Sequence, residues 1–149
     1  ILFGIKYADC VPLLIYGNKY VSLVHSGWRG TKESIVETGL EKMLNLGEKP
    51  HDITLIMGPH IRSSDYEMGD EIPPQFKNEG FPMTIFSKKN GKYYLSLKRA
   101  LLHSLSKYGL KKIIDTGGDT YNDIERFFSY RRDGSHHGEM VMFFVLKEE

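Results

Sequence analysis

The sequence predicts an α+β domain in which mixed or antiparallel β-sheets are flanked by helices. Two amphipathic helical patterns stand among about seven short stretches that are rich in β-branched, aromatic and leucine residues. The 149 residues are 40% hydrophobic and 26% charged, a globular composition that excludes a disordered chain. No repeat, low-complexity tract or linker divides the sequence, so we expect residues 1–149 to form a single domain.

The first predicted unit is a β-hairpin. Residues 1–16 predict a mostly buried strand, in which Pro12 implies an edge position or a bulge because proline donates no ladder hydrogen bond. Residues 20–26 predict the second strand. Gly17-Asn18, between the two strands, suits a two-residue hairpin turn.

Two helices are indicated by capping residues and apolar spacing. Thr31 predicts the N-cap of the first helix, which has apolar residues every three or four positions and ends at Gly47. Ser96 predicts the start of the second helix, which ends at Gly109. Each helix has one apolar stripe, so we expect both to flank a sheet.

Short apolar stretches predict the remaining strands, and Pro73 indicates the start of one short helix. The strand candidates are residues 53–57, 83–86, 92–95, 112–115, 127–131 and 139–146. The last of them is strongly hydrophobic, so we expect it in the centre of a sheet and not at an exposed interface.

Charge and cysteine content limit the partners and the location of the protein. The 20 basic and 19 acidic side chains leave a formal net charge of +1, so no strong field favours nucleic acid or anionic lipid. No apolar run reaches the roughly 20 residues that span a bilayer, which predicts no membrane segment. The single cysteine forms no internal disulfide and no secretory signal opens the sequence, which indicates a cytoplasmic location. The oligomeric state is left open.

The predicted hairpin places the only cysteine opposite a histidine. With Gly17-Asn18 as the turn, Tyr16 faces Lys19, and counting back along both strands pairs Cys10 with His25. Directly opposed residues have Cβ atoms roughly 4.5–5.5 Å apart, close enough to share a metal ion or to pass the thiol proton to the imidazole. The alternative is that Cys10 is a buried small hydrophobe and His25 merely ends a strand.

A tight loop with two glycines, Ser26-Gly27-Trp28-Arg29-Gly30, leads from His25 into the helix predicted at Thr31. Free backbone N–H groups and the helix dipole favour an anion such as phosphate or carboxylate at such a position. Arg29 could add a bidentate grip on that anion. The alternative is that Trp28 fills the core and Arg29 pairs with a surface acid.

A second polar motif, residues 129–134, places two arginines at the end of a predicted strand beside a turn. In a strand only one of Arg131 and Arg132 can face a given side, so we expect the other to be a solvated charge. His136 and His137 follow in the turn and are interpreted as flexible surface residues.

Several motifs along the chain together resemble those of one family. They are Ala8-Asp9-Cys10-Val11-Pro12, His25-Ser26-Gly27-Trp28-Arg29-Gly30, Gly58-Pro59, Tyr66-Glu67 and Phe127-Phe128-Ser129-Tyr130-Arg131-Arg132-Asp133-Gly134. Over essentially the whole chain this series resembles the YfiH-type laccase-domain family, also called multicopper polyphenol oxidoreductases. The linked A-D-C-x-P and H-x-G-W-R-G motifs are the most specific part of the resemblance.

The resemblance implies a fold like the cysteine-hydrolase domain of cytotoxic necrotizing factor and a metal site of one cysteine and two histidines. Cys10 and His25 match two of these ligands. The third family ligand lies in a His-Gly segment upstream of the strand that begins this chain, so we expect a YfiH-like domain that lacks the family's N-terminal portion. The chain also departs from the family pattern at Asp119-Thr120, where Cys-Thr is common, and at His137-Gly138-Glu139, in place of Thr-Gly-Arg.

The function implied by the resemblance is zinc-dependent phosphorolysis of purine nucleosides by phosphate, with adenosine deamination as a second activity. A zinc ion with three protein ligands keeps one position open for water or phosphate. The candidate catalytic residues are Cys10, His25 and Arg29, the candidate substrate or phosphate binders are Gly27, Gly30, Tyr130 and Arg131, and the candidate general bases are Glu67 and Asp9.

Three alternatives stand beside this function. Copper-dependent polyphenol oxidation is the older family label, but multicopper centres need many histidines in His-x-His pairs, and this sequence has 6 histidines and no such pair. In a metal-free Cys-His amidase or deamidase, Cys10 would be the nucleophile and His25 the base. The missing upstream histidine would also fit an inactive, partner-binding remnant.

Overall fold

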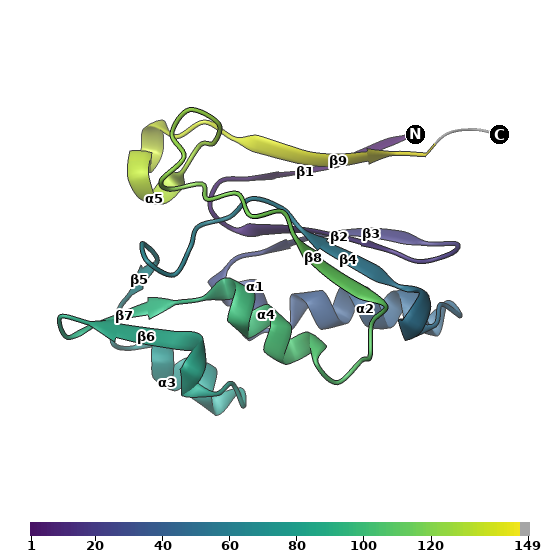
Figure 1. Cartoon of the computed structure of the whole chain (residues 1–149), viewed down its shortest axis with the longest axis horizontal. Coiled ribbons are helices and arrows are strands. Elements are labelled where there is room, and N and C mark those ends of the chain that lie inside the picture. The colour runs from purple at the N-terminus through teal and green to yellow at the C-terminus, as the bar shows by residue number, and fades with distance from the viewer. Residues whose placement is uncertain (147–149) are drawn as a thin grey trace.

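A computed structural model describes residues 1–146 and shows an α+β architecture built on a mixed central sheet (Figure 1). The central sheet has the strand order β3-β2-β4-β8, formed by Val21–Ser26, Val11–Tyr16, Thr54–Met57 and Lys112–Asp115. Strand β2 pairs antiparallel with β3 and β4, whereas β4 and β8 are parallel. The predicted fold class is therefore confirmed.

Helices cover one face of the central sheet, below it in Figure 1: α1 (Trp28–Lys32), α2 (Ile35–Asn45) and α4 (Leu97–Leu105). The apolar stripes that predict these helices form the core, because α2 buries Val36, Leu40 and Met43 and α4 buries Leu97, Leu101 and Leu105. No helix within residues 1–146 combines the length and the apolar character that crossing a membrane requires.

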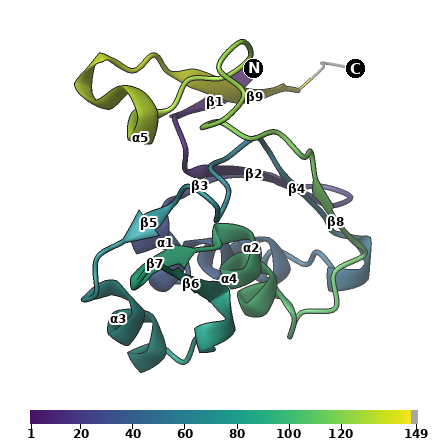
Figure 2. The same cartoon turned by 60° about the vertical axis from the view of Figure 1, so that its left-hand side comes forward.

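A two-stranded ribbon, β1 (Leu2–Tyr7) with β9 (Met140–Val145), lies over the other face of the central sheet (Figures 1 and 2). Val141, Phe143 and Val145 are exposed on its outer face. The prediction that the C-terminal strand lies inside a sheet is therefore wrong. Residues 1–16 also form two strands and not one, because the chain leaves the ladder at residues 8–10.

A small third sheet has the strand order β5-β7-β6, formed by Glu67–Met68, Lys92–Leu95 and Phe86–Lys89. Helix α3 (Ile72–Asn78) packs beside it, and the Phe76 ring contacts Phe86 edge-on with 5.6 Å between centroids. Three short 3₁₀ turns complete the described elements: Pro50–Asp52, Met83–Ile85 and Gly134–His136.

The segment predicted as a strand at residues 127–131 instead runs into a single helical turn, α5 (Tyr130–Asp133). Ser129 is its N-cap, because the Ser129 hydroxyl accepts a hydrogen bond from the Arg132 backbone N–H at 3.1 Å. Arg131 and Arg132 therefore follow helical and not strand geometry. Helix α5 lies beside the ends of the ribbon strands in Figure 2.

Candidate functional site

The β2–β3 hairpin has a register two residues away from the predicted one. Tyr16 pairs with Val21, and a four-residue loop is closed by a 3.0 Å hydrogen bond from the Gly17 N–H to the Tyr20 carbonyl. A carboxylate that is distant in the sequence selects this longer loop. Glu48 accepts hydrogen bonds at 3.0, 2.6 and 2.9 Å from the backbone N–H groups of Asn18, Lys19 and Tyr20. A tight two-residue turn cannot present these three donors to one carboxylate.

The predicted direct pairing of Cys10 with His25 is therefore wrong. His25 lies opposite Pro12, and Cys10 packs against Gly27, where an added Cβ would come within 2.7 Å of the Cys10 sulfur. A shift of two residues keeps side chains on the same face, so Cys10 and His25 still lie near each other. Pro12 sits in an unbroken ladder of an inner strand, which contradicts the predicted edge or bulge.

Cys10 and His25 line one cavity of about 390 Å³, between the end of β1, the start of α1 and α5. The sequence-predicted residues Arg29, Tyr130 and Arg131 line the same cavity. Gly27 is not among the lining residues, but it packs against the Cys10 sulfur. Gly30 is not among the lining residues and packs against Ile35, so the structure gives no support to its predicted phosphate contact.

The imidazole of His25 is oriented by the backbone. Its Nδ1 lies 2.9 Å from the Lys6 carbonyl oxygen. A carbonyl can only accept a hydrogen bond, so Nδ1 carries the proton and Nε2 keeps its lone pair. Metal-ligating histidines usually have this arrangement, in which a backbone carbonyl fixes the tautomer.

The Cys10 thiol is half-buried, and its burial raises its pKa to about 11, with the nearby Asp9 carboxylate adding to the shift. Without a metal the sulfur is therefore protonated at neutral pH and is a weak nucleophile. A bound metal would displace this proton, because the thiolate is the form that coordinates.

Asp9, beside Cys10, is a buried carboxylate with only 5% of its surface exposed. It accepts hydrogen bonds from the Thr120 hydroxyl at 2.7 Å and from the Arg131 backbone N–H at 2.6 Å. Its backbone φ of 84° lies in the left-handed region, which costs free energy for a residue other than glycine. Both carboxylate oxygens are occupied, so Asp9 joins three chain segments and is poorly placed for its predicted role as a general base.

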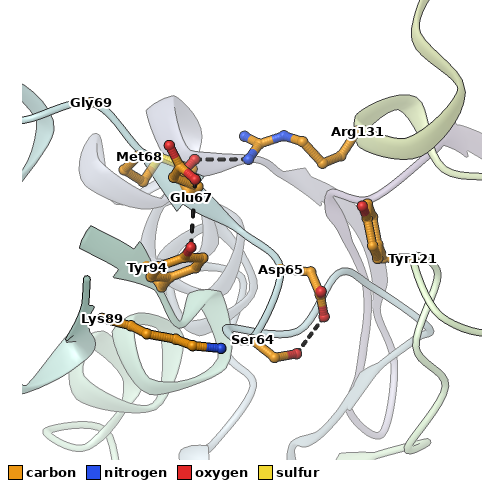
Figure 3. Close-up of a pocket in the computed structure, with 9 residues that line it drawn as sticks. All are labelled: Ser64, Asp65, Glu67, Met68, Gly69, Lys89, Tyr94, Tyr121 and Arg131. Carbon is orange, nitrogen blue, oxygen red and sulfur yellow. Dashed lines mark hydrogen bonds between the residues drawn. The ribbon is translucent and has the colours of Figure 1, made fainter. Parts of the chain in front are cut away.

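Arg131 stands between the Cys10 cavity and a second cavity of about 610 Å³, shown in Figure 3. Its guanidinium lies 5.0 Å from the Tyr66 ring centroid and donates to the Glu67 carbonyl at 2.8 Å. The Glu67 carboxylate lines the second cavity and pairs with Lys92 at 2.8 Å. Glu67 is therefore separated from the Cys10 cavity, which argues against its predicted role as a general base there.

Arg29 reaches the cavity from α1, and its guanidinium lies 4.4 Å from the Trp28 ring centroid. The single helix predicted from Thr31 is divided into α1, which begins at Trp28, and α2, which begins at Ile35 after Ser34, so the predicted N-cap at Thr31 is wrong. Thr31 lies inside α1, and its hydroxyl is hydrogen-bonded to that of Ser26 at 2.8 Å. Thr31 therefore starts no helix that could bind an anion, and the guanidinium groups of Arg29 and Arg131 are the candidate anion-binding groups of the cavity.

One of Arg131 and Arg132 was predicted to be a solvated charge, but Arg131 lines the cavity and Arg132 binds the preceding loop. Its guanidinium donates to the carbonyls of Thr120, Tyr121 and Phe127 at 3.1, 2.9 and 3.1 Å. Arginine has five donors in a fixed fork, which suits it to binding several carbonyl groups at once.

His137 is the cavity residue that sequence reasoning missed. It was expected to be a flexible surface residue, but it is half-buried and lines the cavity together with Cys10 and His25. His136 is exposed, as predicted. The available signal was the position of His137 shortly after the arginine motif at residues 129–134, but the turn that places its ring in the cavity wall cannot be seen in the sequence.

Comparisons with known proteins agree with the motifs. The family model described as multi-copper polyphenol oxidoreductase laccase matches residues 1–147. The chain is 34% identical over 150 residues to a purine nucleoside phosphorylase of Clostridium acetobutylicum, covering 98% of this chain and 63% of the relative. It is 35% identical over 149 residues to the purine nucleoside phosphorylase YlmD of Staphylococcus aureus, covering 96% of this chain and 55% of the relative.

Solved structures show the same likeness. The hypothetical protein YfiH of Bacillus licheniformis matches with a TM-score of 0.90 and 30% identity, covering 98% of this chain and 58% of that one. YlmD of Geobacillus stearothermophilus matches with a TM-score of 0.82 and 29% identity, covering 96% and 56%. The chain thus spans a little more than half the length of these relatives. Its motifs, its fold and the match over residues 1–147 show that it belongs to the multi-copper polyphenol oxidoreductase laccase family, the YfiH-type laccase-domain family.

Proposed function

We propose that the Cys10–His25 cavity binds zinc and catalyses phosphorolysis of purine nucleosides. The observation that carries the proposal is the convergence of a half-buried thiol and an imidazole with a fixed tautomer in one cavity that also contains arginines. The curated relatives named purine nucleoside phosphorylase support the choice of reaction.

The donor set fits part of a zinc site. Cys10 and the Nε2 atom of His25 are ligand types that zinc prefers. Within residues 1–146, no group of three or more His, Cys, Asp and Glu side chains is placed to hold a metal ion. Cys10 and His25 would therefore supply two ligands, and a third would come from outside the described residues. When bound, zinc would act as a Lewis acid and lower the pKa of bound water.

The remaining lining residues suit the two substrates. Arg29 and Arg131 offer guanidinium donors to phosphate, whose charge and geometry match an arginine fork. Tyr130 gives the cavity an exposed aromatic surface on which a purine could stack, whereas the Tyr66 ring is buried and faces the Arg131 guanidinium. Hydrolytic deamination of adenosine is proposed as a second activity, since it uses the same purine surface with water in place of phosphate.

The test measures purine base release with and without phosphate, together with bound metal, in three proteins. Wild type should release base only with phosphate and should retain zinc, whereas His25→Ala should lose both. His51→Ala is the control because His51 is an exposed imidazole outside the cavity. Unchanged turnover in His25→Ala, or no phosphate-dependent release by wild type, would exclude the proposal.

Copper-dependent oxidation of phenols is the second candidate, favoured by the description of the matching family model. Among residues 1–146, Cys10 and His25 offer one thiol and one imidazole in the same cavity, which fall short of a multicopper centre. Oxygen uptake on a phenol together with a copper paramagnetic signal would favour oxidation over phosphorolysis.

A further inference from the structure

His137 is a second imidazole in the cavity that holds Cys10 and His25. It follows the 3₁₀ turn Gly134–His136 and precedes β9, so its backbone joins α5 to the ribbon. Unlike the exposed His136, it is half-buried. The cavity therefore contains a titratable group that metal binding by Cys10 and His25 leaves unused.

The His137 ring is held by two contacts. Its Nδ1 lies 2.9 Å from the Gly134 carbonyl oxygen, and its ring meets Tyr130 edge-on at 5.0 Å between centroids. The carbonyl accepts, so Nδ1 carries a proton, and Nε2 is the atom free to exchange one. Among residues 1–146, Nε2 has no hydrogen-bond partner.

Other groups in the cavity are poorly suited to proton transfer. Both oxygens of the Asp9 carboxylate accept hydrogen bonds, and Glu139 pairs with Lys6 at 2.9 Å. The Tyr66 phenol is buried, which raises its pKa far above neutrality. An imidazole titrates near neutral pH and can both give and take a proton.

We propose that His137 is a catalytic acid in phosphorolysis, protonating the departing purine through Nε2. This inference rests on the proposed function. An oxygen of dihydrogen phosphate forms a bond to C1′ of the pentose as the C1′–N9 bond breaks, and the electron pair of that bond passes to the purine. The imidazolium gives its Nε2 proton to a purine nitrogen. The neutral imidazole then takes a proton from the pentose 1-phosphate, which restores the imidazolium and balances the reaction.

Charged and titratable groups surround the His137 ring, both from its flanking elements and from the cavity wall. These groups are Asp133 and Glu139 on the acidic side, Lys6, Arg29 and Arg131 on the basic side, and the Tyr130 phenol.

The experiment compares His137→Gln with His136→Gln on guanosine and 7-methylguanosine. The purine of 7-methylguanosine already carries a positive charge and leaves without an acid. We expect His137→Gln to lower kcat on guanosine by about 100-fold or more, and to remove the limb of the pH profile in which activity falls as pH rises. Cleavage of 7-methylguanosine should change little, bound zinc should be retained, and His136→Gln should match wild type.

Equal losses on the two nucleosides would overturn the role of His137, because a structural defect does not discriminate between leaving groups. Unchanged guanosine turnover in His137→Gln would also overturn it, while leaving phosphorolysis intact. If wild type cleaves neither nucleoside with phosphate, the proposed function fails and this role fails with it.

Discussion

Asp9 shows how one residue can connect two walls of the cavity, one at Cys10 and one at Arg131. Its neighbour Cys10 is a proposed zinc ligand, and its carboxylate accepts the backbone N–H of Arg131 at 2.6 Å. The left-handed backbone at Asp9 lets the chain turn sharply between β1 and β2, which points Cys10 into the cavity. A non-glycine residue in this conformation is strained, and such strain is often found at functional sites.

The Asp9 contacts predict a ranking of substitutions. Asp9→Ala would leave the Arg131 N–H and the Thr120 hydroxyl without their buried acceptor, so we expect a loss of roughly 3 kcal/mol in the free energy of unfolding. Asp9→Asn should cost less, because its amide oxygen can accept from Arg131, its NH₂ can donate to Thr120, and asparagine tolerates positive φ. Urea unfolding of both variants measures this, and equal losses would contradict the assigned contacts.

The site residues differ in how far the sequence could identify them. Cys10, His25, Arg29 and Arg131 stand in motifs whose residue types already indicate metal or anion chemistry, and the structure brings them to one cavity. His137 could not be identified, because only the three-dimensional turn ending at His136 directs its ring inward.

At the scale of elements, the errors arise where distant contacts decide local structure. Gly17-Asn18 is a good two-residue turn by itself, but the carboxylate of Glu48 binds three loop N–H groups and selects a longer loop. The aromatic run before Tyr130 resembles a strand, yet the Ser129 cap starts a helical turn. That capping signal was present in the sequence and was outweighed by apolar composition. Helices α2 and α4 were predictable because their apolar spacing is long and regular.

An ion-pair cluster at the end of β8 links this strand to α4 and to the loop after β4. The Asp115 carboxylate accepts from Arg62 at 2.8 and 3.1 Å and from Lys98 at 2.9 Å. Burial alone would raise the pKa of Asp115, but these cations and the Gly117 N–H hold it well below its ordinary value. The ionised carboxylate thus stabilises the fold above the unfolded-state pKa, and this stabilisation is lost as pH falls toward the folded-state pKa.

We therefore expect Asp115→Asn to lower the free energy of unfolding by roughly 1–3 kcal/mol at neutral pH. The difference from wild type should stay constant between about pH 5 and 8 and should shrink as pH falls below about 4, where the unfolded carboxyl protonates. Denaturant unfolding across this pH range provides the measurement. A difference that grows toward low pH would contradict the assigned direction of the pKa.

At the scale of the whole molecule, the cavity lies where the three layers meet. The helical layer supplies Arg29, the central sheet supplies His25, and α5 supplies Arg131. Figure 2 shows α5 beside the ribbon. The layered α+β class followed from the pattern of elements. The placement of the ribbon did not follow from this pattern, because the apolar composition of its strands indicates burial on both faces. Only the pairing of β1 with β9 alone shows that one face of the ribbon is exposed. A likeness to cytotoxic necrotizing factor stays a prediction.

The most direct test of the metal site is X-ray absorption at the zinc edge of wild-type protein loaded with zinc. We expect one sulfur neighbour at about 2.3 Å with nitrogen or oxygen neighbours at about 2.0–2.1 Å, and loss of the sulfur in Cys10→Ser. A zinc shell without sulfur in the wild-type protein, or a sulfur that persists in Cys10→Ser, would contradict zinc binding by Cys10.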